Sequence, residues 1–140
     1  MNKKVSDFLS AISAWGRQKY NIKAILLVGS YARGNENADS DIDIVLIVED
    51  QQEFLESDQW VHRFGDANRV AIEDYGKVTS LRVFYESGME IEFGIGGLDW
   101  VSNPIDSGTR TVIQKGIQII YEKENYLSSN KEFMRLFDKR

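Results

Sequence analysis

Two aspartates and a glycine–serine pair are the residues of this sequence whose spacing fits metal and phosphate chemistry. Asp41 and Asp43 stand two positions apart at the start of a predicted strand, so their side chains share one face. Mg²⁺ prefers carboxylate oxygens as ligands, and a pair of metal ions can neutralise a polyphosphate while it reacts. Gly29 and Ser30 close an earlier apolar run, where glycine lets the backbone approach a phosphate. The four residues together indicate a site for metal-bound phosphates.

Two short apolar strands must position these residues. Residues 23–28 form a continuous apolar run, and residues 42–48 form a second run that is rich in β-branched side chains. A parallel crossover usually takes a dozen or more residues, most of them in a helix, and the connection here is short for that. We therefore predict an antiparallel or mixed pair with one helical turn between the strands. The end of the first strand then lies beside the start of the second.

The rest of the chain alternates between helical and strand patterns. Apolar side chains recur with helical spacing over residues 2–20, and residues 94–97 are predicted to interrupt a strand. Further helices are predicted at residues 51–61, 106–115 and 127–139, and further strands at 67–73, 78–86, 89–95 and 117–121. This pattern predicts the α+β class, with a mixed central sheet and helices packed against it.

Composition and charge exclude several kinds of site. The 140 residues are 42% hydrophobic and 28% charged, which is ordinary for one globular domain. The net charge of -5 argues against broad binding of nucleic-acid phosphates. The absence of cysteine and the single histidine exclude disulfides and zinc sites built from thiolates or several histidines. No signal-peptide pattern and no membrane-spanning run is present, so we expect a cytoplasmic protein without a membrane partner.

The ordered run Gly29–Gly34, followed by Ser40–Val45, resembles the defining motif of the DNA-polymerase-β-like nucleotidyltransferase superfamily. The likeness is strongest to aminoglycoside adenylyltransferases and to the minimal nucleotidyltransferases of toxin–antitoxin pairs. A weaker likeness, to the aminoglycoside 6-adenylyltransferase type, extends over residues 60–121. The resemblance implies a fold like the palm of polymerase β, with residues 1–140 forming a single nucleotidyltransferase domain.

The resemblance also implies a role for each motif residue. Gly29 and Ser30 would bind the triphosphate of a nucleotide, which we expect to be ATP. Asp41 and Asp43 would ligate Mg²⁺, with two ions expected. Arg33 either contacts phosphate or pairs with neighbouring acids. Further candidate cations for the phosphate tail, among which the spacing does not choose, are Arg82, Arg110 and Lys115.

In that superfamily a third carboxylate comes from a later strand. Glu90 and Glu92 lie on one face of the run at residues 89–95. We prefer Glu92, because apolar Ile91 and Phe93 flank it as in the superfamily pattern, whereas Glu90 lies nearer a turn. Glu92 would complete the catalytic and metal-binding set, either as a ligand or as the base that takes a proton from the acceptor hydroxyl.

The acceptor is the part of the function that the motif leaves open. An aminoglycoside-like small molecule and a side chain of a partner protein both fit, while the acidic charge argues against a nucleic-acid end. Antibiotic-modifying relatives hold the acceptor with a further helical domain, and here only one helix is predicted after residues 117–121. Either a homodimer mate or a helical partner protein therefore completes the cleft, or the acceptor differs from that of these relatives. The alternative function is that of an antitoxin-type nucleotidyltransferase, which modifies or simply binds a partner protein.

Overall fold

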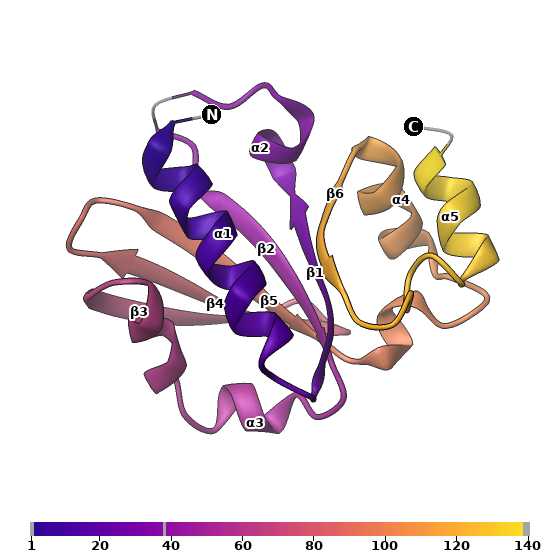
Figure 1. Ribbon diagram of the computed structural model, residues 1–140, viewed down its shortest axis with the longest axis horizontal. Helices are drawn as coiled ribbons and strands as arrows, with labels where there is room; N and C mark the ends of the chain where they lie inside the picture. Colours follow the sequence, from indigo (N-terminus) through magenta and orange to yellow (C-terminus); the bar gives the residue numbers. More distant parts are fainter. Residues whose placement is uncertain (1, 38, 139–140) are drawn as a thin grey trace.

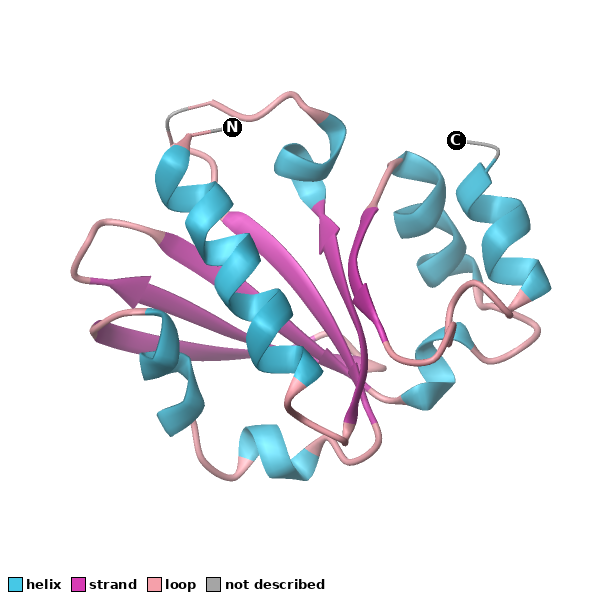
Figure 2. Ribbon diagram, in the orientation of Figure 1, coloured by secondary structure: helices cyan, strands magenta, loops and turns pink. Residues whose placement is uncertain are grey.

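The structure, a computed structural model, describes residues 2–37 and 39–138, which form a six-stranded sheet with helices on both faces (Figure 1). Figure 2 shows the same arrangement by secondary structure. The strands are β1 (Ile22–Val28), β2 (Ile42–Val48), β3 (Ala67–Asp74), β4 (Val78–Tyr85), β5 (Glu90–Gly96) and β6 (Gln118–Glu122). The helices are α1 (Lys3–Arg17), α2 (Gly29–Arg33), α3 (Gln52–Leu55), α4 (Ser107–Lys115) and α5 (Lys131–Asp138), with two short 3₁₀ helices, η1 (Gln59–Phe64) and η2 (Leu98–Val101).

The strands lie in the order β3-β4-β5-β2-β1-β6, which confirms the predicted mixed sheet. Among the neighbouring strands of the described chain, β2 and β5 run parallel and the other pairs run antiparallel. The antiparallel pairing of β1 with β2 places Val28 opposite Asp43, as the short connection predicts. The parallel pairing of β2 with β5 places Asp43 beside Glu92. Strand β2 therefore links the two halves of the predicted site.

Helices α1 and η1 cover the first face of the sheet. The side chain of Asn2 caps α1, because its Oδ1 accepts a hydrogen bond from the Val5 N–H at 3.0 Å. The buried positions of α1, Ile12 and Trp15 among them, recur with helical spacing and face the sheet. Trp15 stacks on Trp60 of η1, with ring centroids 5.3 Å apart. Helix α1 lies across the sheet in Figure 1, and the apolar layer beneath it supports the strands from the side opposite the predicted site.

The second face is apolar over one part of its width and charged over another. Helices α4 and α5 pack beside β6 and β1 (Figure 1). Their apolar cluster includes Ala24 and Leu26 of β1 and Val45 and Ile47 of β2. Side chains alternate between the two faces of a strand, so Asp43, two residues before Val45, lies on this same face of β2. The C-terminal helices therefore bury the apolar end of β2 and leave its acidic end to the site.

Residues 51–61, predicted as one helix, form the separate helices α3 and η1 instead. The break lets Trp60 turn back, so that its indole N–H donates to the Phe54 carbonyl at 3.0 Å. The two rings also meet edge to face, with centroids 5.9 Å apart. Packing of the aromatic rings under the sheet therefore overrides the helical continuity that the local sequence suggests.

The predicted interruption of the strand at residues 94–97 is wrong, because β5 continues through Gly96. A Cβ on Gly94 would stand 2.9 Å from Cγ1 of Val78 on the neighbouring strand. Glycine at this position therefore serves the close approach of two strands and not a turn.

The C-terminal third follows the predicted order of helix, strand and helix. Helix α5 begins at Lys131, four residues later than predicted, because Asn130 caps it by accepting the Phe133 N–H at 3.0 Å. The last predicted residue of that helix, 139, lies outside the described residues. Within the part of the chain that the structure describes, no helix has both the length and the apolar character needed to cross a membrane.

Truncation of Ile12 tests the packing of α1 on the sheet. Ile12 is fully buried, so Ile12→Ala removes apolar contacts and leaves a cavity, which should lower the free energy of unfolding by about 2–5 kcal/mol. Ser10→Ala, at an exposed position of the same helix, is the matched control and should change it by less than about 0.5 kcal/mol. Urea unfolding followed by tryptophan fluorescence measures both. Equal effects of the two substitutions would contradict the described packing.

Candidate active site

The end of β1 and the start of β2 build the first half of the site. Gly29 follows β1 with a φ of +72°, a left-handed conformation that favours glycine, and leads directly into α2. A Cβ on Gly29 would stand 3.1 Å from Asp43 Cγ and closer still to its Oδ2. Position 29 therefore requires glycine for its backbone conformation and for the space that Asp43 occupies. The sequence motif indicated only the approach of a phosphate.

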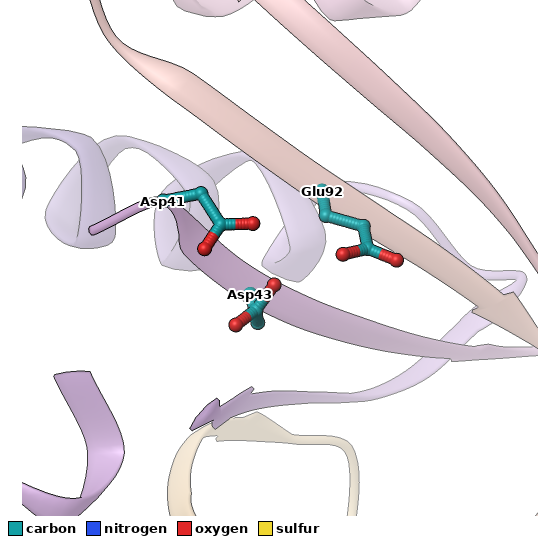
Figure 3. Close-up of side chains that lie close together, drawn as sticks. All are labelled: Asp41, Asp43 and Glu92. Atoms are coloured by element: carbon teal, nitrogen blue, oxygen red, sulfur yellow. The ribbon is translucent and has the colours of Figure 1, made fainter. Parts of the chain in front are cut away.

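Three carboxylates meet at this point. Asp41 directly precedes β2, Asp43 lies on β2, and Glu92 lies on β5 beside Asp43. One oxygen atom from each lies within 4.8 Å of the others. Figure 3 shows the three side chains directed toward a common space. The structure thus brings together the three residues that the sequence predicts as metal ligands, and each of them remains partly exposed.

Arg82 of β4 pairs with most of the acids in this region. Four carboxylates pair with Arg82, and a fifth, Asp43, interacts with two of them. We call these five side chains the carboxylate cluster: Asp41, Asp43, Glu73, Glu90 and Glu92. Nη1 donates to Asp41 Oδ2 at 2.9 Å and to Glu90 Oε2 at 2.6 Å. Nη2 donates to Glu92 Oε2 at 3.0 Å, and Nε donates to Glu73 Oε1 at 3.0 Å. One guanidinium group therefore pairs with four carboxylates.

The two glutamates of β5 take different places. Glu92 lies within the group of three carboxylates and its side chain is 18% exposed, whereas Glu90 pairs with Arg82 and is 37% exposed. This placement favours Glu92 over Glu90 as the third ligand, as the sequence pattern predicts. Sequence reasoning missed Glu73, because its contact with Arg82 depends on the pairing of β3 with β4 and no local motif marks it.

Asp43 holds its proton unusually tightly. Burial, together with the neighbouring carboxylates of Asp41 and Glu92, raises the pKa of its carboxyl to about 8. At neutral pH the Asp43 carboxyl is therefore protonated in most molecules of the metal-free protein. A metal ion that binds here has to displace this proton.

The donor set fits a hard divalent cation. The three side chains offer carboxylate oxygens only, which suits Mg²⁺ better than the softer transition metals. The oxygens of the three side chains lie within 4.8 Å of one another, and a divalent cation would offset the negative charge that they bring together. Asp41, Asp43 and Glu92 are therefore the residues that could hold such an ion.

A hollow of about 290 Å³ opens beside Asp43 and Glu92. Its remaining lining residues are small or apolar: Val28, Ile44, Val45, Val78, Ser80 and Gly94. Pockets that enclose whole small ligands run from roughly 300 to 1,000 Å³. The hollow can therefore enclose one portion of a small ligand beside the two carboxylates.

Among the described residues, the predicted cations other than Arg82 form no ion pair with the carboxylate cluster. Arg33 is exposed at the end of α2, and a Cβ on Gly116 would stand 3.4 Å from its Cγ. Gln118 joins α2 to β6 by donating from Nε2 to the Ala32 carbonyl at 3.1 Å. Arg110 and Lys115 belong to α4 and not to the sheet. Contacts of these cations with phosphate stay predictions.

The sequence profile of one protein family, described as streptomycin adenylyltransferase, matches residues 2–134. The chain belongs to this family. The match includes the glycine–serine turn and all three carboxylates of the site. No curated protein matches the sequence closely enough to count as a relative.

Solved structures similar to this member of the streptomycin adenylyltransferase family are also nucleotidyltransferases. An aminoglycoside 6-adenyltransferase from Bacillus subtilis superposes with a TM-score of 0.58 and 16% identity, over 74% of this chain and 38% of that one. A CCA-adding enzyme from Thermotoga maritima superposes with a TM-score of 0.50 and 19% identity, over 94% of this chain and 32% of that one. The chain thus spans about a third of the length of these proteins. The predicted superfamily and fold are confirmed.

A substitution at Gly29 tests the contact between the turn and the site. Gly29→Ala should lower the free energy of unfolding by more than the roughly 1–2 kcal/mol of a left-handed backbone, because its Cβ would also displace Asp43. It should weaken Mn²⁺ binding as well. Gly34→Ala is the matched control, since Gly34 has a φ of +74° and open space around its Cα. Urea unfolding and Mn²⁺ titration measure the two effects.

If Gly29→Ala and Gly34→Ala lose the same stability and bind Mn²⁺ equally well, the contact of residue 29 with Asp43 has no consequence for the site.

The raised pKa of Asp43 predicts how stability depends on pH. The folded protein binds this proton more tightly than the unfolded chain, whose pKa lies near the ordinary value of 3.8. The stabilisation is therefore complete below that value and is lost as the pH rises through about 8. In urea unfolding with a chelator, from about pH 5 to about pH 9, the wild-type protein should lose more stability than Asp43→Asn, which cannot titrate. Parallel pH profiles for the two proteins would show that Asp43 has an ordinary pKa.

Proposed function

We propose that this chain carries the catalytic site of an Mg²⁺-dependent adenylyltransferase, which moves AMP from ATP to a hydroxyl group of an acceptor. The observation that supports it most is the meeting of Asp41, Asp43 and Glu92 within 4.8 Å, next to a glycine turn. Membership of the streptomycin adenylyltransferase family supports the type of group transferred.

The reaction is an in-line displacement at the α-phosphorus. The acceptor oxygen forms a bond to this phosphorus, the bond to the β-phosphate oxygen breaks, and pyrophosphate leaves with the electron pair. Bound Mg²⁺, with two ions expected, would supply the positive charge that offsets the charge on the phosphates. Asp41 and Asp43 would hold the metal. Glu92 completes the set, as a ligand or as the base that takes the proton of the acceptor hydroxyl.

The nucleotide lies between the turn after β1 and the open part of the second face. Gly29 and Ser30 bind the triphosphate through the backbone at the start of α2, and Arg33 is the candidate cation on that helix. The hollow beside Asp43 and Glu92 takes the nucleoside portion, since its walls are mostly apolar and its volume suits one such group.

The acceptor in this proposal is a small, positively charged compound with hydroxyl groups, of the aminoglycoside kind. The family description names streptomycin, and the similar Bacillus subtilis protein is an aminoglycoside 6-adenyltransferase. The carboxylate cluster places several acids against one guanidinium beside the reacting groups, and this charge favours a cationic acceptor. Because the chain spans 38% of that protein, a further domain, a second copy or a partner chain supplies the remaining acceptor contacts.

An assay of AMP transfer tests the proposal. The protein is incubated with α-labelled ATP, Mg²⁺ and a panel of aminoglycosides, and labelled product is separated by chromatography. Asp43→Asn and Glu92→Gln should lower the rate at least about a hundredfold, since each removes a carboxylate that holds metal or moves a proton. Glu90→Gln is the matched control on the same strand and should retain most of the activity.

Two results would contradict the proposal. One is the absence of Mg²⁺-dependent ATP binding in calorimetry at millimolar nucleotide. The other is a larger loss of activity in Glu90→Gln than in Glu92→Gln, which would exchange the roles of the two glutamates. Binding of ATP without transfer to any small acceptor would instead favour a partner protein as the acceptor.

A further inference from the structure

Arg82 lies at the centre of the carboxylate cluster and is the positive charge closest to the proposed metal ligands. Its side chain is 24% exposed, so solvent screens it only in part. The register of the sheet fixes its position, because Arg82 lies opposite Glu92 on β5, and Glu92 in turn lies beside Asp43 on β2. The guanidinium is therefore held in the same row of the sheet as the ligands.

The contacts of Arg82 fall into two groups. Asp41 and Glu92, which accept hydrogen bonds at 2.9 and 3.0 Å, are proposed metal ligands. Glu73 and Glu90, which accept at 3.0 and 2.6 Å, lie outside the set of three. The second group anchors the guanidinium independently of the first, so Arg82 can release Asp41 and Glu92 without losing all of its partners.

The positive charge and a metal ion compete for the same oxygens. A carboxylate oxygen that accepts a hydrogen bond from a guanidinium has fewer lone pairs available for a metal ion. A divalent ion that binds near this group is also repelled by its charge. Without Arg82, on the other hand, the crowded carboxylates would repel one another in the metal-free protein.

We propose that Arg82 is a resident counter-ion of the metal site, which holds Asp41 and Glu92 while the site is free of metal and yields them to divalent cations. The proposal rests on the proposed function in taking these carboxylates as metal ligands. Arg82 then acts as a positioning residue that sets the metal concentration at which the site fills. It competes with the metal and does not assist its binding.

Titration of Mn²⁺ alone into the purified protein tests this competition. Arg82→Met removes the charge and keeps an unbranched side chain, and it should bind Mn²⁺ at least about tenfold more tightly than the wild type, given the repulsion between a divalent ion and a nearby unit charge. Arg82→Gln keeps hydrogen-bond donors without the charge, and it should also bind Mn²⁺ more tightly than the wild type. Arg69→Met is the matched control, because Arg69 stacks on Phe84 outside the cluster, and it should bind as the wild type does.

Thermal unfolding with and without Mg²⁺ is a second test. If Arg82 had only a structural role, Mg²⁺ would not change the effect of its substitution on the unfolding temperature. In a chelator, Arg82→Met should unfold at a lower temperature than the wild type, because four carboxylates have lost their partner. Saturating Mg²⁺ should narrow this difference, since the metal replaces the missing charge. For Arg69→Met the difference should be the same with and without Mg²⁺.

The outcomes separate this inference from the proposed function. If the wild type binds Mn²⁺ and the Arg82 variants bind it equally or more weakly, Arg82 does not compete with the metal ion. The proposed metal site is then still supported, because the wild type binds Mn²⁺. The inference is overturned if Mg²⁺ fails to narrow the difference in unfolding temperature between Arg82→Met and the wild type. It is also overturned if Arg82→Met and Arg82→Gln both stay unfolded in Mg²⁺, because the metal then does not replace Arg82. If none of the proteins binds Mn²⁺, even with nucleotide, the proposed function fails at its metal site.

Discussion

Repulsion among carboxylates that several strands bring together is the constraint to which the rest of this structure is fitted. Burial, together with the nearby carboxylates of Asp41 and Glu92, raises the pKa of Asp43 to about 8. A cluster of this kind is unfavourable unless protons, cations or a rigid frame offset it. Arg82 supplies the cation, and Asp43 retains a proton. The frame comes from the sheet, whose first face is packed with aromatic and aliphatic side chains.

The two sides of β2 explain how this frame also leaves room for a ligand. One side of the strand belongs to the apolar layer under α1, and the other changes from acidic to apolar along its length. Helices α4 and α5 cover the apolar portion, so the acidic portion and the hollow beside it stay open. The same strand thus contributes to both hydrophobic clusters and presents the proposed ligands. The fold shared with the Bacillus subtilis structure agrees with this frame.

Much of the fold and the centre of the site could be predicted from the sequence, because their signals are local. Asp41 and Asp43 stand two positions apart, Gly29 ends an apolar run, and the bounds of β2 agree with the predicted strand. The partners of Arg82 could not be predicted, since they depend on the register of β3, β4 and β5 together. The break between α3 and η1 follows from tertiary packing of aromatic rings, which local helical periodicity does not report.

The parallel pairing of β2 with β5 has a consequence for the order in which the chain folds. Gly29 and Asp43 are close in sequence, so the turn after β1 and the first two ligands can form from local contacts. Glu92 joins them only when a long segment, including the hairpin of β4 and β5, has closed onto β2, and closing such a loop costs conformational entropy before any contact offsets it. The hairpin can carry Glu92 and Arg82 to β2 as a unit, because the two residues are already opposite each other within it. Glu92 and the Arg82 guanidinium that offsets its charge would then reach the forming site in the same step. The aspartates would not meet an unpaired glutamate during folding.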